Sequence, residues 1–260
     1  MKTEQTELPV EDTVQIDPND PIIEITKLCK SFGTQQVLKD LSLKLYNGEN
    51  LVVLGKSGSG KSVLIKCIVG LLRSDSGTIQ VFNHDVTALT VKELGKVRQE
   101  IGFLFQSGAL YDSMTVKQNL EFPLIRLKTE LSEKDRNAKI EEVLENVGLS
   151  DALYKMPSQL SGGMRKRISL ARTIVVDPKI ILYDEPTTGL DPVTSDEISV
   201  LINDIQKKYK TSSIIITHDI ECARATADRL IMLQNGQIYA DGDIDGYENS
   251  KDKVIKAFFK

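Results

Sequence analysis

Short apolar runs rich in Ile, Val and Leu recur along the chain from Ile22 onward, separated by longer stretches with helical spacing. Five runs are almost continuously apolar, and they span residues 51–54 (LVVL), 101–105 (IGFLF), 180–183 (IILY), 213–217 (SIIIT) and 230–233 (LIML). Strands that are apolar throughout are buried on both faces, which is typical of a parallel sheet covered by helices. The pattern therefore predicts an α/β fold with a mostly parallel core sheet.

Other short segments alternate apolar and polar residues, and they lie at 22–28, 41–45, 78–81 and 237–240. Alternation indicates strands with one buried and one exposed face. We expect these segments to form half-exposed antiparallel strands at one side of the core sheet. The expected fold includes an antiparallel β subdomain.

The chain between residues 106 and 177 has little strand texture. Within it, residues 132–147 place four apolar side chains on one helical face, and Gly148 then ends the pattern. We expect an α-helical subdomain, over about 107–177, inserted into an α/β domain that spans residues 22–242.

Charge is distributed unevenly along the chain. Residues 1–21 hold one Lys and six acids (1 − 6 = −5) with almost no apolar pattern, which predicts a disordered acidic arm. The whole chain has 33 Lys and Arg against 37 Asp and Glu, a balance of −4, so residues 22–260 stand at −4 + 5 = +1. Domains that bind nucleic acid are usually strongly basic, so we expect no nucleic-acid partner. Residues 243–260 are predicted to be a C-terminal extension.

Neither membrane insertion nor secretion is indicated. No apolar run approaches the ~20 residues that cross a bilayer, and the N-terminus lacks the basic start and apolar core of a signal peptide. The three cysteines are too few and too scattered for a disulfide framework. We therefore expect a cytosolic globular protein.

Residues 55–62 (GKSGSGKS) match the phosphate-binding pattern G-x-x-x-x-G-K-[ST] in full, between the run LVVL and an apolar helical stretch. Glycines let backbone N–H groups surround phosphate oxygens, and the helix N-terminus adds partial positive charge. Lys61 can reach the β- and γ-phosphates, and the Ser62 hydroxyl can bind Mg²⁺. The candidate nucleotide-binding residues here are Gly55, Lys56, Ser57, Gly58, Ser59, Gly60, Lys61 and Ser62.

Polar side chains follow three other predicted strands, where open α/β sheets bind their ligands. Asp184 is placed to bind Mg²⁺, and Glu185 to orient a water on the γ-phosphate. Gln106 can contact metal or water, and His218 can bridge the γ-phosphate and Glu185. The pattern favours hydrolysis over binding alone. The candidate catalytic residues are Glu185, His218, Gln106 and Lys61, and the candidate metal ligands are Ser62, Gln106 and Asp184.

Residues 160–164 (LSGGM) precede an apolar, basic helical stretch. Ser-Gly-Gly at a helix start is a possible anion site by itself. Between a P-loop and an acidic strand end, however, LSGG is the signature of ATP-binding cassette (ABC) ATPases, which this chain resembles from about Ile22 to Ala240.

Further marks of the ABC family follow in order. Phe32 lies 55 − 32 = 23 residues before the P-loop, where the family stacks an aromatic ring on adenine. Gln106 matches the Q-loop, residues 189–191 (GLD) match the D-loop, and His218 matches the switch histidine. The resemblance adds these candidate ATP-binding residues: Phe32, Ser161, Gly162, Gly163 and Asp191.

The resemblance implies a function that needs partners. In this family two cassettes form a head-to-tail dimer, with each ATP between the P-loop of one and the signature of the other. A homodimer is expected for a chain with one cassette. The helical subdomain would pass the motion to membrane permease subunits, which places the protein peripherally on the cytoplasmic face of the inner membrane.

Three strings resemble the ATPases of Mla/Mce-type lipid transporters, which move phospholipids or related apolar molecules across the bacterial envelope: 105–116 (FQSGALYDSMTV), 160–167 (LSGGMRKR) and 183–195 (YDEPTTGLDPVTS). This resemblance implies an Mce-domain lipid-binding partner. Residues 107–122 would then form the groove for the permease, with apolar contacts from Leu110, Tyr111 and Phe122. Alternatively, these residues pack inside the helical subdomain.

Other functions are compatible with parts of the sequence. A soluble ABC ATPase that assists iron–sulfur cluster assembly has a similar length. ABC ATPases acting on nucleic acid or ribosomes usually carry long insertions or two cassettes, and we interpret the basic run 165–167 as a solvated helix face. A GTPase would need an N-K-x-D motif, which is absent. A regulatory ATP-binding module would not need both Glu185 and His218.

Overall fold

The computed structural model describes residues 20–259, so nearly all of the predicted acidic arm lies outside the described residues. The core is a six-stranded sheet with the order β10-β9-β3-β8-β7-β6. Every neighbouring pair is parallel except β10 with β9. The strands are β3 (Asn50–Leu54), β6 (Ile101–Leu104), β7 (Ile180–Asp184), β8 (Ser212–Thr217), β9 (Arg229–Gln234) and β10 (Gln237–Gly242).

A separate four-stranded antiparallel sheet has the order β2-β1-β4-β5. Its strands are β1 (Pro21–Phe32), β2 (Gln35–Tyr46), β4 (Ser76–Val81) and β5 (His84–Asp85). Three of the four predicted alternating segments lie in this sheet. The fourth, residues 237–240, is the antiparallel strand at the edge of the core sheet, because β10 directly follows β9 through a tight turn and pairs back on it.

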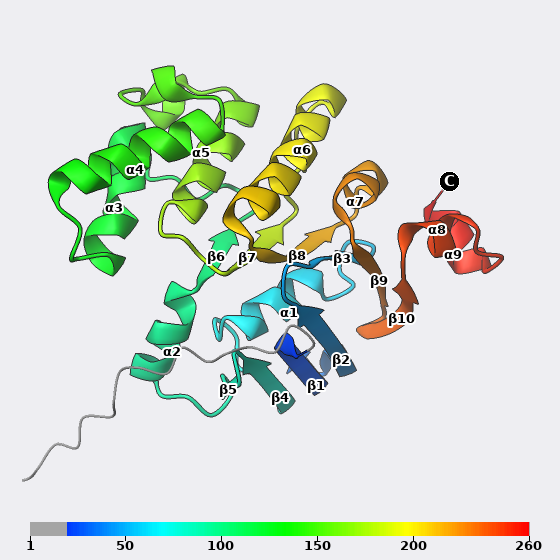
Figure 1. The fold of residues 1–260 in the computed structure, drawn as a ribbon. Coiled ribbons are helices and arrows are strands. Elements are labelled where there is room, and N and C mark those ends of the chain that lie inside the picture. Colours follow the sequence, from blue (N-terminus) through cyan, green and yellow to red (C-terminus); the bar gives the residue numbers. More distant parts are fainter. Residues whose placement is uncertain (1–19, 260) are drawn as a thin grey trace, which may run out of the picture.

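The two faces of the core sheet bury alternate residues in two different cores. One core holds Val52, Tyr183, Ile215 and Met232 together with helices that cover that face. The other holds the neighbouring strand residues, the antiparallel sheet and α1 (Lys61–Ile68). Figure 1 shows this layering, with α1 between the two sheets. The continuous apolar runs thus follow from burial on both sides.

Three helices lie between β6 and β7 in the sequence, on the side of the core sheet opposite the antiparallel sheet (Figure 1). They are α3 (Val116–Leu127), α4 (Glu133–Asn146) and α5 (Gly162–Ile174), with short 3-10 turns at Ser150–Ala152 and Pro157–Gln159. Ser132 caps α4 by accepting a hydrogen bond from Asp135 N. The helical character expected for this stretch is therefore confirmed, and so is the α/β class with its antiparallel β part.

The remaining helices surround the core sheet: α2 (Val91–Gln99), α6 (Pro192–Tyr209), α7 (Ile220–Thr226), α8 (Ile244–Glu248) and α9 (Lys253–Phe258). Tyr247 of α8 and Ile255 of α9 are buried in the same core as α5 and α6, and the Phe259 ring lies 5.7 Å from that of Tyr247. The last residues described thus pack on their own domain. Within residues 20–259, no helix is long and apolar enough to cross a membrane.

Candidate functional site

Four adjacent strands deliver the predicted site residues to one edge of the core sheet. In the order β3, β8, β7 and β6, their carboxyl ends lead into the P-loop, His218, Asp184 with Glu185, and the Q-loop at Gln106. The strands are parallel, so these residues meet although they are far apart in sequence. This juxtaposition is the one expected from the apolar runs.

The P-loop adopts a conformation that requires its glycines. Gly58 and Gly60 have φ angles of +80° and +109°, a backbone region that disfavours other residues. A Cβ on Gly55 would lie 2.6 Å from the carbonyl oxygen of Leu233. The Lys61 Nζ donates to the carbonyl oxygen of Gly55 at 2.7 Å and to that of Lys56 at 3.4 Å. Lys61 therefore folds back over its own loop.

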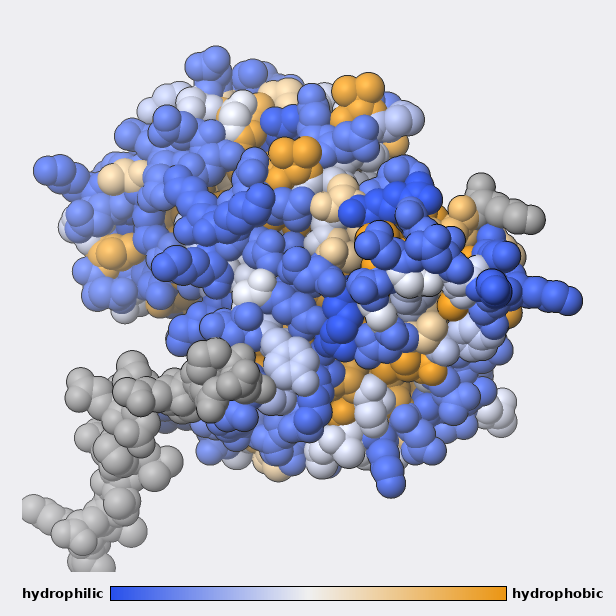
Figure 2. Space-filling view, turned by 45° about the vertical axis from the view of Figure 1, so that its right-hand side comes forward, coloured by the Kyte–Doolittle hydropathy of each residue, from blue (hydrophilic) through white to orange (hydrophobic). Residues whose placement is uncertain are grey.

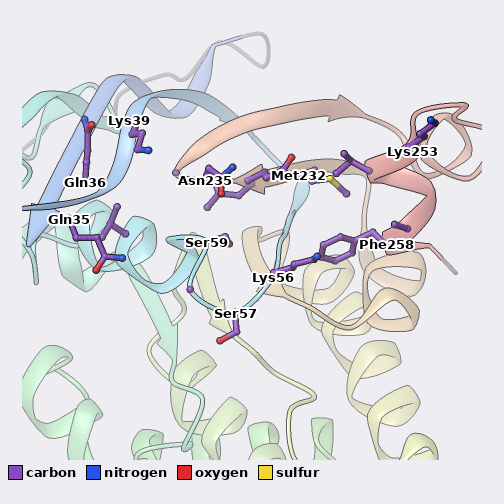
Figure 3. A pocket seen from close by; sticks show the side chains of 17 residues that line it. Gln35, Gln36, Lys39, Lys56, Ser57, Ser59, Met232, Asn235, Lys253 and Phe258 are labelled. Atoms are coloured by element: carbon purple, nitrogen blue, oxygen red, sulfur yellow. The ribbon is translucent and has the colours of Figure 1, made fainter.

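A cavity of about 780 Å³ adjoins the P-loop. Its walls are residues 56–59 of the P-loop, residues 35–37 of β2, the β9–β10 turn and one side of α9, as Figure 3 shows. Cavities of roughly 300–1,000 Å³ hold ligands the size of a nucleotide. The Ser59 hydroxyl beside it is buried and has no hydrogen-bond partner among the described residues, so it can donate to an incoming anion.

The expected metal ligands Ser62 and Asp184 lie together, because Ser62 Oγ donates to Asp184 Oδ1 at 3.0 Å. Burial raises the pKa of the Asp184 carboxyl, and the Ser62 hydrogen bond opposes this shift. A hydroxyl and a carboxylate are oxygen donors of the kind that Mg²⁺ prefers, so the pair fits that ion. Gln106 is exposed, and within residues 20–259 its side chain makes no hydrogen bond to this pair.

Glu185 is buried, and its carboxylate contacts the other catalytic candidates. Its Oε2 lies 2.7 Å from His218 Nδ1, and its Oε1 lies 3.3 Å from Lys61 Nζ. Thr188 Oγ1 donates to Oε2 at 3.2 Å. Glu185 also has a φ of +51°, a left-handed conformation that costs about 1–2 kcal/mol for a residue other than glycine. Strain of this kind is typical of functional positions.

Lys166 also contacts the segment of Glu185, and the sequence did not lead us to expect this role for Lys166. The run 165–167 was expected to be a solvated helix face, but Lys166 is only 7% exposed. Its Nζ donates to the carbonyl oxygen of Gln106 at 2.7 Å and to that of Glu185 at 3.2 Å. Burial lowers the pKa of its ammonium group to about 8, against the opposing charges of Asp184 and Glu185. The missed signal was helical spacing, because positions 166, 169, 170 and 173 share the buried face of α5.

The signature lies at the start of α5 and faces solvent. Ser161 caps this helix by accepting from Met164 N at 3.2 Å. A Cβ on Gly163 would lie 2.5 Å from Thr194 Cγ2, so only glycine allows this close packing against α6. Asp191 accepts hydrogen bonds from Thr194 Oγ1 at 2.6 Å and, as the cap of α6, from Thr194 N at 3.1 Å, and these bonds lower the pKa of its carboxyl. The signature and the D-loop are thereby adjacent.

Within the described residues of one chain, the signature residues and Phe32 are not brought into contact with the P-loop site. Among the hydrogen bonds of the described residues, none links Ser161, Gly162 or Gly163 to the P-loop. Phe32 ends β1; the residue is 48% exposed, and the Lys30 Nζ lies 5.5 Å from its ring centroid. It does not line the 780 Å³ cavity, although its strand partner Gln35 does.

The fold and the site define a P-loop NTPase with an acidic pair after the neighbouring strand and a second glycine-rich helix start. A family model described as ABC transporter matches residues 38–188. The chain therefore belongs to the ABC transporter family, whose cassettes couple ATP hydrolysis to transport.

Individual relatives agree with this assignment. The chain is 41% identical over 236 residues to "Probable ribonucleotide transport ATP-binding protein mkl" of Mycobacterium leprae, covering 91% of this chain and 68% of that protein. It is 37% identical to "Methionine import ATP-binding protein MetN" of Rhizobium johnstonii, covering 90% and 64%. The chain thus spans about two thirds of the length of these relatives.

Solved structures also match. The dimeric, post-hydrolysis ATP-binding cassette MJ0796 bound to ADP and Pi is 32% identical, with a TM-score of 0.78 over 85% of this chain and 98% of that one. The cassette cbiO1 of Clostridium perfringens, described as part of the ABC transporter complex cbiONQ, is 28% identical, with a TM-score of 0.82 over 93% and 96%.

Proposed function

We propose that this chain is the motor subunit of a transporter that moves phospholipid or related apolar molecules across the bacterial envelope. The supporting observation is that the three Mla/Mce-like strings meet at one point. Lys166, from residues 160–167, donates to Gln106 of residues 105–116 and to Glu185 of residues 183–195. The three strings are therefore in contact with one another at the edge of the sheet that carries the catalytic candidates.

In this proposal, the P-loop binds the ATP phosphates and Lys61 turns from its own loop toward them. Ser62 and Asp184 would hold Mg²⁺, which when bound neutralises charge on the phosphates, with Gln106 as a further ligand. Glu185 accepts a proton from the attacking water. His218 keeps the carboxylate in place through their 2.7 Å contact.

A second cassette would complete the site. The exposed positions of Ser161, Gly162 and Asp191 leave them free to contact ATP held by the partner, together with Gly163. The dimeric cassettes among the similar structures support a homodimer. Phe32 is exposed and able to stack on adenine. We also propose that residues 22–242 form one ABC ATPase domain, into which a helical subdomain of about residues 107–177 is inserted. Residues 243–260 are proposed to form a C-terminal extension.

We propose that the permease binds beside the Q-loop, and such a contact would hold the protein at the cytoplasmic face of the inner membrane. Tyr111 is 41% exposed and is held by the Phe122 ring, 5.2 Å away, and by the Arg172 guanidinium at 4.7 Å. Leu110 instead packs against the core. Figure 2 shows a surface that is mostly hydrophilic, with apolar residues in a few separate groups. We therefore propose Tyr111 as the main apolar contact.

The decisive experiment is a pull-down of the tagged full chain from detergent-solubilised membranes. An all-helical permease together with an Mce-domain protein supports the proposal. Recovery of a permease with a nucleotide- or methionine-binding protein would contradict a lipid cargo and favour the cargo named for the relatives. Recovery of cluster-assembly proteins alone would favour the iron–sulfur function. Tyr111→Ala should lose the permease. Tyr239→Ala, 44% exposed on β10, is the matched control that should keep it.

A further inference from the structure

Lys166 occupies an unusual place between the Q-loop and the catalytic acid. Its side chain runs from α5 into the protein, and its Nζ lies between two backbone carbonyl oxygens, those of Gln106 and Glu185. We propose that Lys166 is a positioning residue that fixes the Glu185 backbone relative to the Q-loop and so aligns the carboxylate for hydrolysis. This inference rests on the role proposed for Glu185.

The burial of Lys166 argues for a specific task. A charged amine that leaves water is unfavourable unless it is hydrogen-bonded, and Lys side chains are almost never this buried without a partner. Here the ammonium group donates to two main-chain oxygens that are 185 − 106 = 79 residues apart in the sequence. An apolar side chain of the same length would fill the space but make neither bond.

Glu185 needs such support because its backbone is in the left-handed region, with φ at +51°. Its N–H donates to the Ile216 carbonyl oxygen at 2.9 Å, which fixes one side of the residue. Its own carbonyl oxygen accepts from Lys166 and, at 3.3 Å, from the Thr188 N–H. Without Lys166, only the longer of these two bonds keeps this carbonyl oriented.

Displacement of the Glu185 backbone would move its carboxylate away from His218. A shift of about 1 Å in a catalytic group can lower the rate about a hundredfold, even when the substrate still binds. Because Lys166 also bonds the Gln106 carbonyl, movement of the Q-loop would be transmitted directly to Glu185. The Lys166 amine therefore connects the proposed permease contact region to the hydrolytic centre.

The test compares turnover and nucleotide binding of the purified full chain with Lys166→Met, which keeps the side-chain length and removes the donors. Phosphate release gives kcat and KM, and titration with fluorescent mant-ATP gives the affinity. Lys166→Arg restores donors at the same place. Lys179→Met is the matched control, because the Lys179 side chain is 67% exposed and contacts Glu100 and the Phe82 ring rather than a candidate site residue.

The proposal predicts that Lys166→Met lowers kcat about 10–100-fold with KM and mant-ATP affinity within about twofold, and that Lys166→Arg recovers much of the loss. Lys179→Met should behave like the wild type. The proposal is overturned if Lys166→Met retains wild-type kcat, if kcat and affinity fall together with the melting temperature, or if Lys166→Arg is no better than Lys166→Met. Glu185→Gln separates the two hypotheses, because full turnover in that variant refutes the role of Glu185 itself.

Discussion

Replacement of Glu185 by Gln removes one negative charge and leaves the shape of the side chain nearly unchanged. The amide can keep a hydrogen bond to His218, whose Nδ1 lies 2.7 Å from Oε2. It cannot accept a proton from water, and it ends the ion pair with Lys61 at 3.3 Å. The change therefore separates proton transfer from nucleotide binding.

Two magnitudes follow from this geometry. A general base contributes about 10²–10⁴ to the rate, which is about 2.7–5.5 kcal/mol of transition-state stabilisation. The attraction between Lys61 and Glu185 at 3.3 Å is about 5 kcal/mol at an effective dielectric constant of 20, before desolvation is subtracted. ATP must compete with this pair for Lys61. We therefore expect kcat to fall at least a hundredfold while ATP affinity is unchanged or increases.

The assay measures phosphate release at saturating Mg-ATP, mant-ATP affinity, and the mass in solution by light scattering with ATP present. Glu185→Gln should accumulate a dimer, because the bound ATP is not consumed. Glu24→Gln, on β1 with its side chain 38% exposed and paired with Lys44, is the control that should retain wild-type turnover. Turnover of Glu185→Gln within about twofold of the wild type would refute the general-base role. A tenfold weaker ATP affinity would refute the competition for Lys61.

Three further predictions test other parts of the structure. Lys61→Ala should abolish mant-ATP binding, and unchanged affinity would contradict the P-loop assignment. Buried Asn119 donates to three carbonyl oxygens and accepts from one N–H, all between residues 111 and 115. Asn119→Leu should therefore lower the free energy of unfolding in urea by about 2–3 kcal/mol. A change below about 0.5 kcal/mol would contradict this expectation. Burial raises the pKa of the Cys67 and Cys222 thiols to about 11, so only about one in a thousand of these thiols is a thiolate at pH 8. Iodoacetamide should therefore label the native chain at Cys29 alone, which mass spectrometry of the peptides would show.

Much of the fold was predictable because burial determines the sequence of the core strands. The five continuous apolar runs each became a parallel strand, since alternate residues pack into two different cores. Residues 237–240 form an antiparallel strand at one side of the core sheet, as expected, but the pattern did not separate this edge strand from the three segments of the antiparallel sheet. Alternation reports that one face of a strand is exposed, and it does not report which neighbour the strand pairs with. A strand at the edge of the core sheet therefore has the same pattern as one in the antiparallel sheet.

The placement of the candidate site residues was predictable where it depends on short spacing, as in residues 55–62 and the pair after β7. Helical spacing could have placed Lys166 on the buried face of α5. Its two hydrogen-bond acceptors could not be predicted, because they are backbone oxygens supplied by other segments. The neighbours of Lys166 on the same helix do face outward, with Arg167 bound to Glu197. The residue types of the basic run 165–167 therefore do not reveal that Lys166 points inward.

The burial of the site residues divides their tasks. Lys61, Asp184, Glu185 and Lys166 are all less than 10% exposed and are held by hydrogen bonds within the chain. Phe32 and residues 161–162 are exposed and have no partner near the P-loop among the described residues. In the proposed mechanism, a single chain therefore preorganises the phosphate side of the site and leaves the other side of the nucleotide uncovered. Substitutions of the buried group should act on a single chain, whereas Ser161→Ala should impair turnover only under conditions in which two cassettes associate.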